Sequence, residues 1–96
     1  MLDFYELQRE HEAAKFRFVL MELEVAITFA QTALNSDSDE KAARNVANSK
    51  RAYGAAIKFL QQSAITPEMS KLVGDRIQRL SILLGEKLPP APQNRY

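Results

Sequence analysis

Residues 16–34, FRFVLMELEVAITFAQTAL, decide the fold, because apolar side chains cover most of the circumference of an α-helix here. At about 100° per residue, they form two neighbouring faces. The first face consists of Phe16, Leu20, Leu23, Ile27, Ala30 and Leu34, and the second of Phe18, Met21, Val25 and Phe29. A helix with so broad an apolar arc needs neighbours on at least two sides, so we expect the rest of the chain to pack around it.

The same helix is predicted to begin at Asp3, an N-cap residue with Glu6 three positions later, and to end at Leu34. Its first half differs from its second half, because only a sparse apolar seam runs among the charges. That seam consists of Phe4, Leu7, His11 and Ala14. We therefore expect the first half to extend beyond the helices that cover the second half.

Residues 35–40, NSDSDE, predict a short turn between two antiparallel helices, with Asp37 and Glu40 as a capping pair. The second helix, over about 38–62, has a seam of mostly small residues that permits close approach to the bulky first helix. The seam is Ala42, Val46, Ser49, Tyr53, Ala56 and Leu60, with Ala43, Ala47 and Ile57 alongside. Gly54 is interpreted as a point of close helix crossing.

Thr66, Pro67 and Glu68 predict the start of a third helix, as N-cap, first-turn proline and first-turn acid. Gly85 is placed to end it. Its inward residues are predicted to be Met69, Leu72, Val73, Ile77, Leu80, Leu83 and Leu84. The fold class is therefore all-α, an up-down-up three-helix bundle with a long first helix, over residues 1–88. A Pro-rich extended tail follows over 89–96.

Composition limits the possible functions of this chain of 96 residues, which has no cysteine and a net charge of +1. Residues 1–40 carry nine acids and three bases, whereas residues 41–67 carry five bases and no acid. This asymmetry suits either an anionic partner or an acidic helix packed beside a basic one. Glu22 and Glu24 interrupt the best apolar run before it reaches membrane-spanning length, so we expect a soluble, cytoplasmic protein.

Side chains suited to catalysis are scarce, since His11 is the only histidine. The run from His11 to Lys15 is similar to a zinc-binding His-Glu-x-x-His helix, but Lys15 stands where the second ligand must be. We therefore expect no enzyme, no metal site and no cofactor.

A line of basic residues follows the outward face of the second helix. It consists of Lys41, Arg44, Arg51 and Lys58, the last three at intervals of seven. Such a line can bind phosphate groups, although it has no interleaved aromatic residues. The alternative interpretation is a solvated face, or one paired with acids of a neighbour.

Three segments resemble the microtubule-interacting-and-trafficking domain, a three-helix bundle. They are LxxAIxxAxxAxxxD from Leu23, YxxAIxFL from Tyr53 and DRxQRL from Asp75. Residues 53–67 also resemble the second helix of a tetratricopeptide repeat, but the motif has no second copy, so a repeat array is excluded. The resemblance implies a groove between the second and third helices that receives a partner helix. Its rim would then include Arg76, Arg79 and Ile82.

The sequence thus favours a non-enzymatic helical adaptor that binds another protein and self-associates as a homodimer. The basis is a helix of core-like composition in a chain too short to cover it, with Phe18, Val25 and Phe29 on the uncovered face. The alternative is an anion-binding module for nucleic acid or an acidic membrane surface, which would use the basic residues of the second helix.

Overall fold

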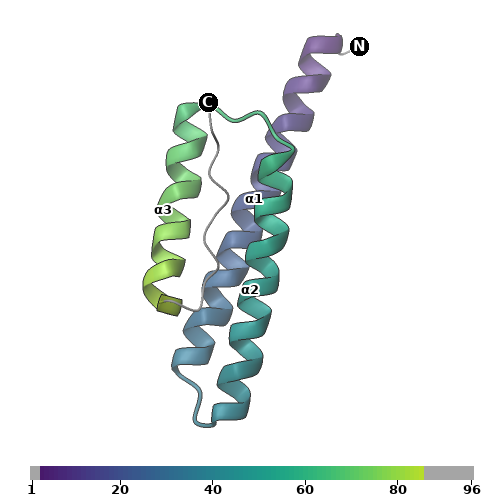
Figure 1. Cartoon of the computed structure of the whole chain (residues 1–96). Helices are drawn as coiled ribbons and strands as arrows, with labels where there is room; N and C mark the ends of the chain where they lie inside the picture. Colours follow the sequence, from purple (N-terminus) through teal and green to yellow (C-terminus); the bar gives the residue numbers. More distant parts are fainter. Residues whose placement is uncertain (1–2, 86–96) are drawn as a thin grey trace.

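The computed structural model describes residues 3–85 and contains three α-helices. α1 spans Phe4–Leu34, α2 spans Asp39–Gln61 and α3 spans Pro67–Leu84. Successive helices run in opposite directions, and α2 and α3 both pack against α1 (Figure 1). This arrangement confirms the predicted all-α bundle with a long first helix. The predicted tail over 89–96 lies outside the described residues.

Helix ends follow the predicted capping chemistry at three places. Asp3 accepts a hydrogen bond from the backbone N–H of Glu6 at 2.8 Å. Thr66 accepts one from the N–H of Met69 at 3.2 Å, with Pro67 in the first turn of α3. Gly85 ends α3 with a φ of 60°, a conformation that favours glycine.

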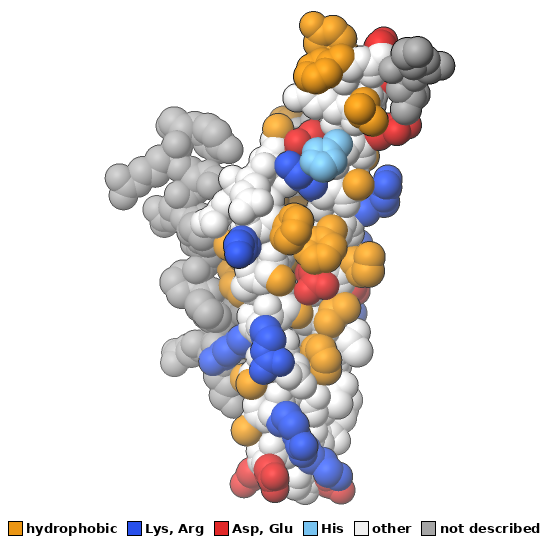
Figure 2. Space-filling view, turned by 90° about the vertical axis from the view of Figure 1, so that its right-hand side faces the viewer, with side chains coloured by type: hydrophobic (Ala, Val, Ile, Leu, Met, Phe, Trp, Pro, Cys, Tyr) orange, Lys and Arg blue, Asp and Glu red, His pale blue; other side chains and the backbone are white. Residues whose placement is uncertain are grey.

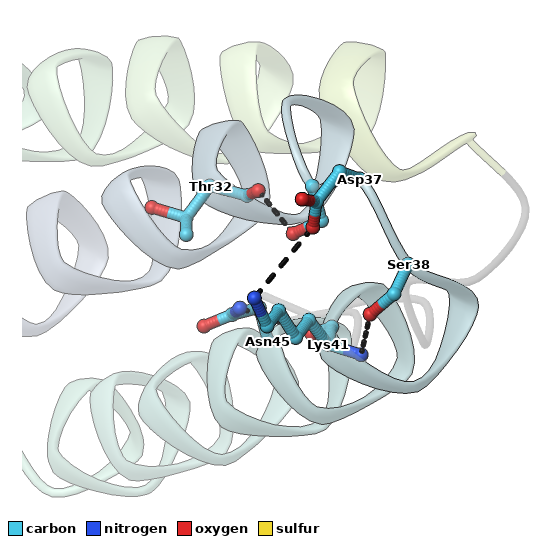
Figure 3. A network of polar contacts seen from close by, with 6 residues as sticks. Thr32, Asp37, Ser38, Lys41 and Asn45 are labelled. Atoms are coloured by element: carbon cyan, nitrogen blue, oxygen red, sulfur yellow. Dashed lines mark hydrogen bonds and ion pairs between the residues drawn. The ribbon is translucent and has the colours of Figure 1, made fainter.

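The turn between α1 and α2 is short, as predicted, but a different residue caps α2. Ser38, not Asp37, is the N-cap of α2, because its Oγ accepts the N–H of Lys41 at 3.2 Å (Figure 3). The predicted capping pair of Asp37 and Glu40 is therefore wrong. Asp37 lies one residue too early, and its carboxylate forms an ion pair with Lys41 Nζ at 3.6 Å. Both side chains are largely exposed, so this pair contributes little to stability.

The core lies along one side of α1, between α2 and α3. Its α1 members are Val19, Leu23, Ala26, Ile27 and Ala30, which meet Ala52, Tyr53 and Ala56 of α2 and Val73, Leu80 and Leu84 of α3. The buried arc thus includes Val19 and Ala26, which neither predicted face contained. Leu34 was predicted to be buried but is 62% exposed, because its neighbour Ala33 occupies the buried side of the last turn of α1.

Close contact between α1 and α2 depends on small side chains, as predicted. Ser49 is fully buried, and its hydroxyl donates a hydrogen bond of 2.7 Å to the carbonyl oxygen of Ala26. A larger side chain at position 49 would separate the two backbones. Ala43 and Ala47 are exposed, contrary to the prediction, and so is Leu72 in α3. Each of these helices buries a narrower arc than its apolar pattern suggested.

Gly54 does not mark a close helix crossing. It is exposed, and a Cβ atom added at this position would meet nothing within 4 Å. The prediction of a crossing point is therefore wrong. The glycine lies in the interior of α2 and leaves that helix with a conformational cost that no contact of its own offsets.

Replacing Gly54 with alanine is accordingly expected to stabilise the protein. Gly54→Ala should raise the free energy of unfolding by about 0.5–1 kcal/mol, because alanine restricts the unfolded chain and fits the helix without a clash. Urea denaturation followed by circular dichroism measures the change. A lower free energy of unfolding in the variant would contradict the open space found around position 54.

Tyr53 is the buried aromatic residue of α2, with only 3% of its surface exposed. Its hydroxyl has no hydrogen-bond partner among the described residues. Burial raises the pKa of the Tyr53 phenol above its ordinary value of 10.0, because the charged phenolate is poorly solvated in the core. The hydroxyl therefore adds a desolvation cost without a compensating bond.

Tyr53→Phe is expected to leave the free energy of unfolding at pH 7 unchanged or to raise it by up to about 1 kcal/mol. The variant should also lose less stability above pH 10. Because the folded-state pKa of Tyr53 is raised, the phenol ionises first in the unfolded chain. The wild-type protein therefore keeps its full stability below the unfolded-state pKa and loses stability as pH rises from there through the folded-state pKa. Urea denaturation at pH 7 and pH 11 tests both points. Equal loss of stability in the two proteins at high pH would contradict the second.

Candidate interaction surface

The first turns of α1 project beyond the rest of the bundle. The connection between α2 and α3 crosses α1 near Glu12, whose carboxylate accepts the backbone N–H of Ala64 at 3.2 Å. The residues before this level form the projecting upper end of α1 in Figure 1. Phe4 and Leu7 in this segment are 73% and 58% exposed. We call residues 4–11 the α1 overhang, and its existence agrees with the uneven apolar pattern of the sequence.

A second exposed apolar feature continues along α1 below the overhang. We call it the α1 strip; it consists of Phe18, Met21, Val25 and Phe29. Met21 is 59% exposed and Val25 37%, while the two phenylalanines are half-buried. Figure 2 shows hydrophobic side chains gathered along this face of the molecule. Of the three α1 residues that the sequence assigned to a partner, Val25 is therefore exposed, and Phe18 and Phe29 are partly accessible.

α2 adds an aromatic residue to the α1 strip. The ring of Phe59 lies 4.4 Å from that of Phe18, centroid to centroid, at an interplanar angle of 44°. Phe59 is 36% exposed, so the pair forms part of the surface and not of the core. Sequence reasoning missed Phe59. Residues four apart lie on the same side of a helix, so Phe59 could have been placed on the side of Ala55, which lines the groove with α1.

A shallow groove runs between α1 and α2 beside the strip. It is lined by Glu22, Val25 and Phe29 of α1 and by Asn48, Arg51, Ala52 and Ala55 of α2. Its apolar lining consists of Val25 and Phe29 of α1 and of the small residues Ala52 and Ala55 of α2. One acid and one base lie at its edges. This groove can receive the ridge of another helix but offers no enclosed volume for a small molecule.

The basic line of α2 lies beside this apolar surface. All four of its residues, Lys41, Arg44, Arg51 and Lys58, are exposed. Arg51 also lines the groove, whereas Lys41 is held by Asp37 at the far end of the helix. Figure 2 shows Lys and Arg side chains next to the hydrophobic band. The structure therefore brings the apolar and the basic candidates onto one face, which the sequence treated as separate possibilities.

The three candidates on α3 do not join that face. Arg76 turns towards α1, where its Nε donates to Glu24 Oε1 at 2.9 Å. It therefore ties α3 to α1 and is not a rim residue facing α2. Arg79 is exposed, and Ile82 is 77% exposed on the outer side of α3.

Within residues 3–85, no cluster of three or more His, Asp or Glu side chains is arranged to hold a metal ion. In the same part of the chain, no helix has both the length and the apolar content to cross a membrane. Comparison with protein-family models, with curated proteins and with solved structures finds no match.

Proposed function

We propose that this protein is a non-enzymatic helical interaction module that self-associates through the face formed by α1 and α2. The observation that carries the proposal is the α1 strip, extended by Phe59, which is partly exposed beside a shallow groove between α1 and α2. Contiguous apolar surface of this kind, bordered by charged residues, is typical of protein interfaces.

The arrangement of the helices explains why this surface has no partner within residues 3–85. α2 and α3 pack on α1 from the side opposite Met21 and Val25, and the core closes without the strip. Aromatic side chains such as Phe18 and Phe29 also carry much of the binding energy in protein interfaces. A helix from a second copy has the shape needed to cover them, and the charged border would fix its orientation.

Val25→Asp is expected to weaken self-association at least about tenfold, because it places a carboxylate in the middle of the buried interface. Sedimentation equilibrium of both proteins measures the dissociation constant. Leu72→Asp provides a matched control, since Leu72 is exposed on α3 to a similar degree, 44% against 37%. A wild-type protein that stays monomeric up to about 100 μM would overturn self-association.

The alternative function, anion binding, is favoured by one feature of α2. Beyond Glu40 this helix carries only basic charged residues, and Arg44, Arg51 and Lys58 are exposed along one line. Such a line would contact phosphates of nucleic acid or of an acidic membrane surface.

A triple variant tests this alternative directly. Replacing Arg44, Arg51 and Lys58 with glutamine should abolish binding to DNA, RNA and anionic vesicles at low ionic strength, and wild-type binding should fall steeply with added salt. Fluorescence anisotropy and vesicle sedimentation are suitable measurements. Absence of wild-type binding at low salt would remove this function and leave the interaction module as the explanation of the α1–α2 face.

A further inference from the structure

The α1 overhang and the α1 strip belong to one continuous seam. Its residues follow one another at alternating spacings of three and four, which is the heptad pattern of a coiled coil. The seam residues are Phe4, Leu7, His11, Ala14, Phe18, Met21 and Val25. This regular spacing runs from the unsupported end of α1 to the middle of the packed segment, over about 32 Å of helix.

Solvent reaches this seam along its whole length. Phe4, Leu7 and Met21 are each more than half exposed, His11 and Ala14 are exposed, and Val25 is 37% exposed. Only Phe18 is half-buried, by its contact with Phe59. A hollow on the overhang, lined by Phe4, Leu7, His11 and Ala14 among others, continues the same face. Three heptads of open seam are enough for a two-stranded coiled coil.

Charged residues border the seam in a regular order. Glu10 and Arg17 occupy equivalent positions on one side, and Lys15 and Glu22 occupy equivalent positions on the other. In a two-stranded coiled coil these flanking positions pair between helices and determine partner and orientation. The signs alternate along each side, so the match between two helices depends on their direction and register.

We propose that two copies of this chain pair through α1 in parallel and in register, a model that rests on the proposed self-association. In this arrangement Glu10 lies opposite Lys15 of the second copy, and Arg17 lies opposite Glu22 of the second copy. The two-fold symmetry produces each ion pair twice. Every seam residue meets its own counterpart, so all seven layers are covered.

Antiparallel registers satisfy the same residues less well. Centring the pair between Phe18 and Met21 matches the charges but places Phe4 and Leu7 opposite polar residues near the end of α1. Centring it between His11 and Ala14 leaves Val25 uncovered. A third antiparallel register, centred midway between these two, places Lys15 opposite Lys15 of the second copy. It also places Arg17 opposite Arg17 of the second copy, so both contacts are repulsive.

Cysteine cross-linking tests the orientation, and the natural absence of cysteine makes each introduced thiol unambiguous. Under mild oxidation of the full chain, Leu7→Cys and Val25→Cys should each form a covalent dimer, because both positions meet themselves in the parallel pair. Leu72→Cys on α3 should not. Cross-linking between Phe18→Cys and Met21→Cys in a mixture, without cross-linking of Leu7→Cys or Val25→Cys, would overturn the parallel model in favour of an antiparallel one.

Sedimentation of the same samples separates failure of the orientation from failure of the proposed function. A wild-type dimer without cross-links at positions 7 and 25 would contradict only the parallel seam. A wild-type monomer would contradict self-association itself, and the seam with it.

Charge reversal provides a second test that does not depend on disulfide geometry. Arg17→Glu should weaken the dimer about tenfold, since it converts two attractive pairs into repulsive ones. Adding Glu22→Arg to that variant should restore the wild-type dissociation constant. An equally weak double variant would overturn the predicted pairing of Arg17 with Glu22 of the second copy.

Discussion

The structure depends on a mismatch between the apolar surface of α1 and the number of helices available to bury it. Apolar residues cover most of the circumference of α1 between residues 16 and 34, but α2 and α3 occupy only one side of it. The core closes around Leu23 and Ile27, where both partner helices reach α1. On the opposite side, Met21 and Val25 are exposed, and Phe18 and Phe29 are half-buried. Within residues 3–85, the exposed face therefore reflects where α2 and α3 pack on α1 and not a local irregularity.

Small side chains allow the close approach of α1 and α2. Ser49, Ala52 and Ala56 of α2 are buried, and the Ser49 hydroxyl donates a hydrogen bond to the carbonyl oxygen of Ala26. At the edge of this contact, Phe59 of α2 lies against Phe18 of α1. The exposed apolar surface of α1 therefore continues onto α2.

The fold could be predicted from the sequence where local chemistry alone determines the outcome. The caps at Asp3 and Thr66 and the glycine at position 85 depend only on neighbouring residues, and all three predictions were confirmed. Predictions that required the rotation of one helix against another were less accurate. Leu34, Leu72 and Gly54 were predicted to be packed against another helix because of their residue type and spacing. Whether such a residue is covered depends on where the partner helices lie, and these three are exposed. The α1 strip was predictable as a second apolar face, whereas the joining of Phe59 and the basic residues to it required the tertiary structure.

The overhang of α1 has a consequence for the entropy of association. A separate peptide of this length would be largely unfolded in water, because the first helical turn fixes several dihedral angles for a single hydrogen bond. Here the packed part of α1 has already formed that nucleus, and residues 4–11 need only propagate it. The apolar side chains of the overhang are therefore presented on a preformed helix. A partner that binds there meets a surface whose backbone ordering was completed when the bundle folded.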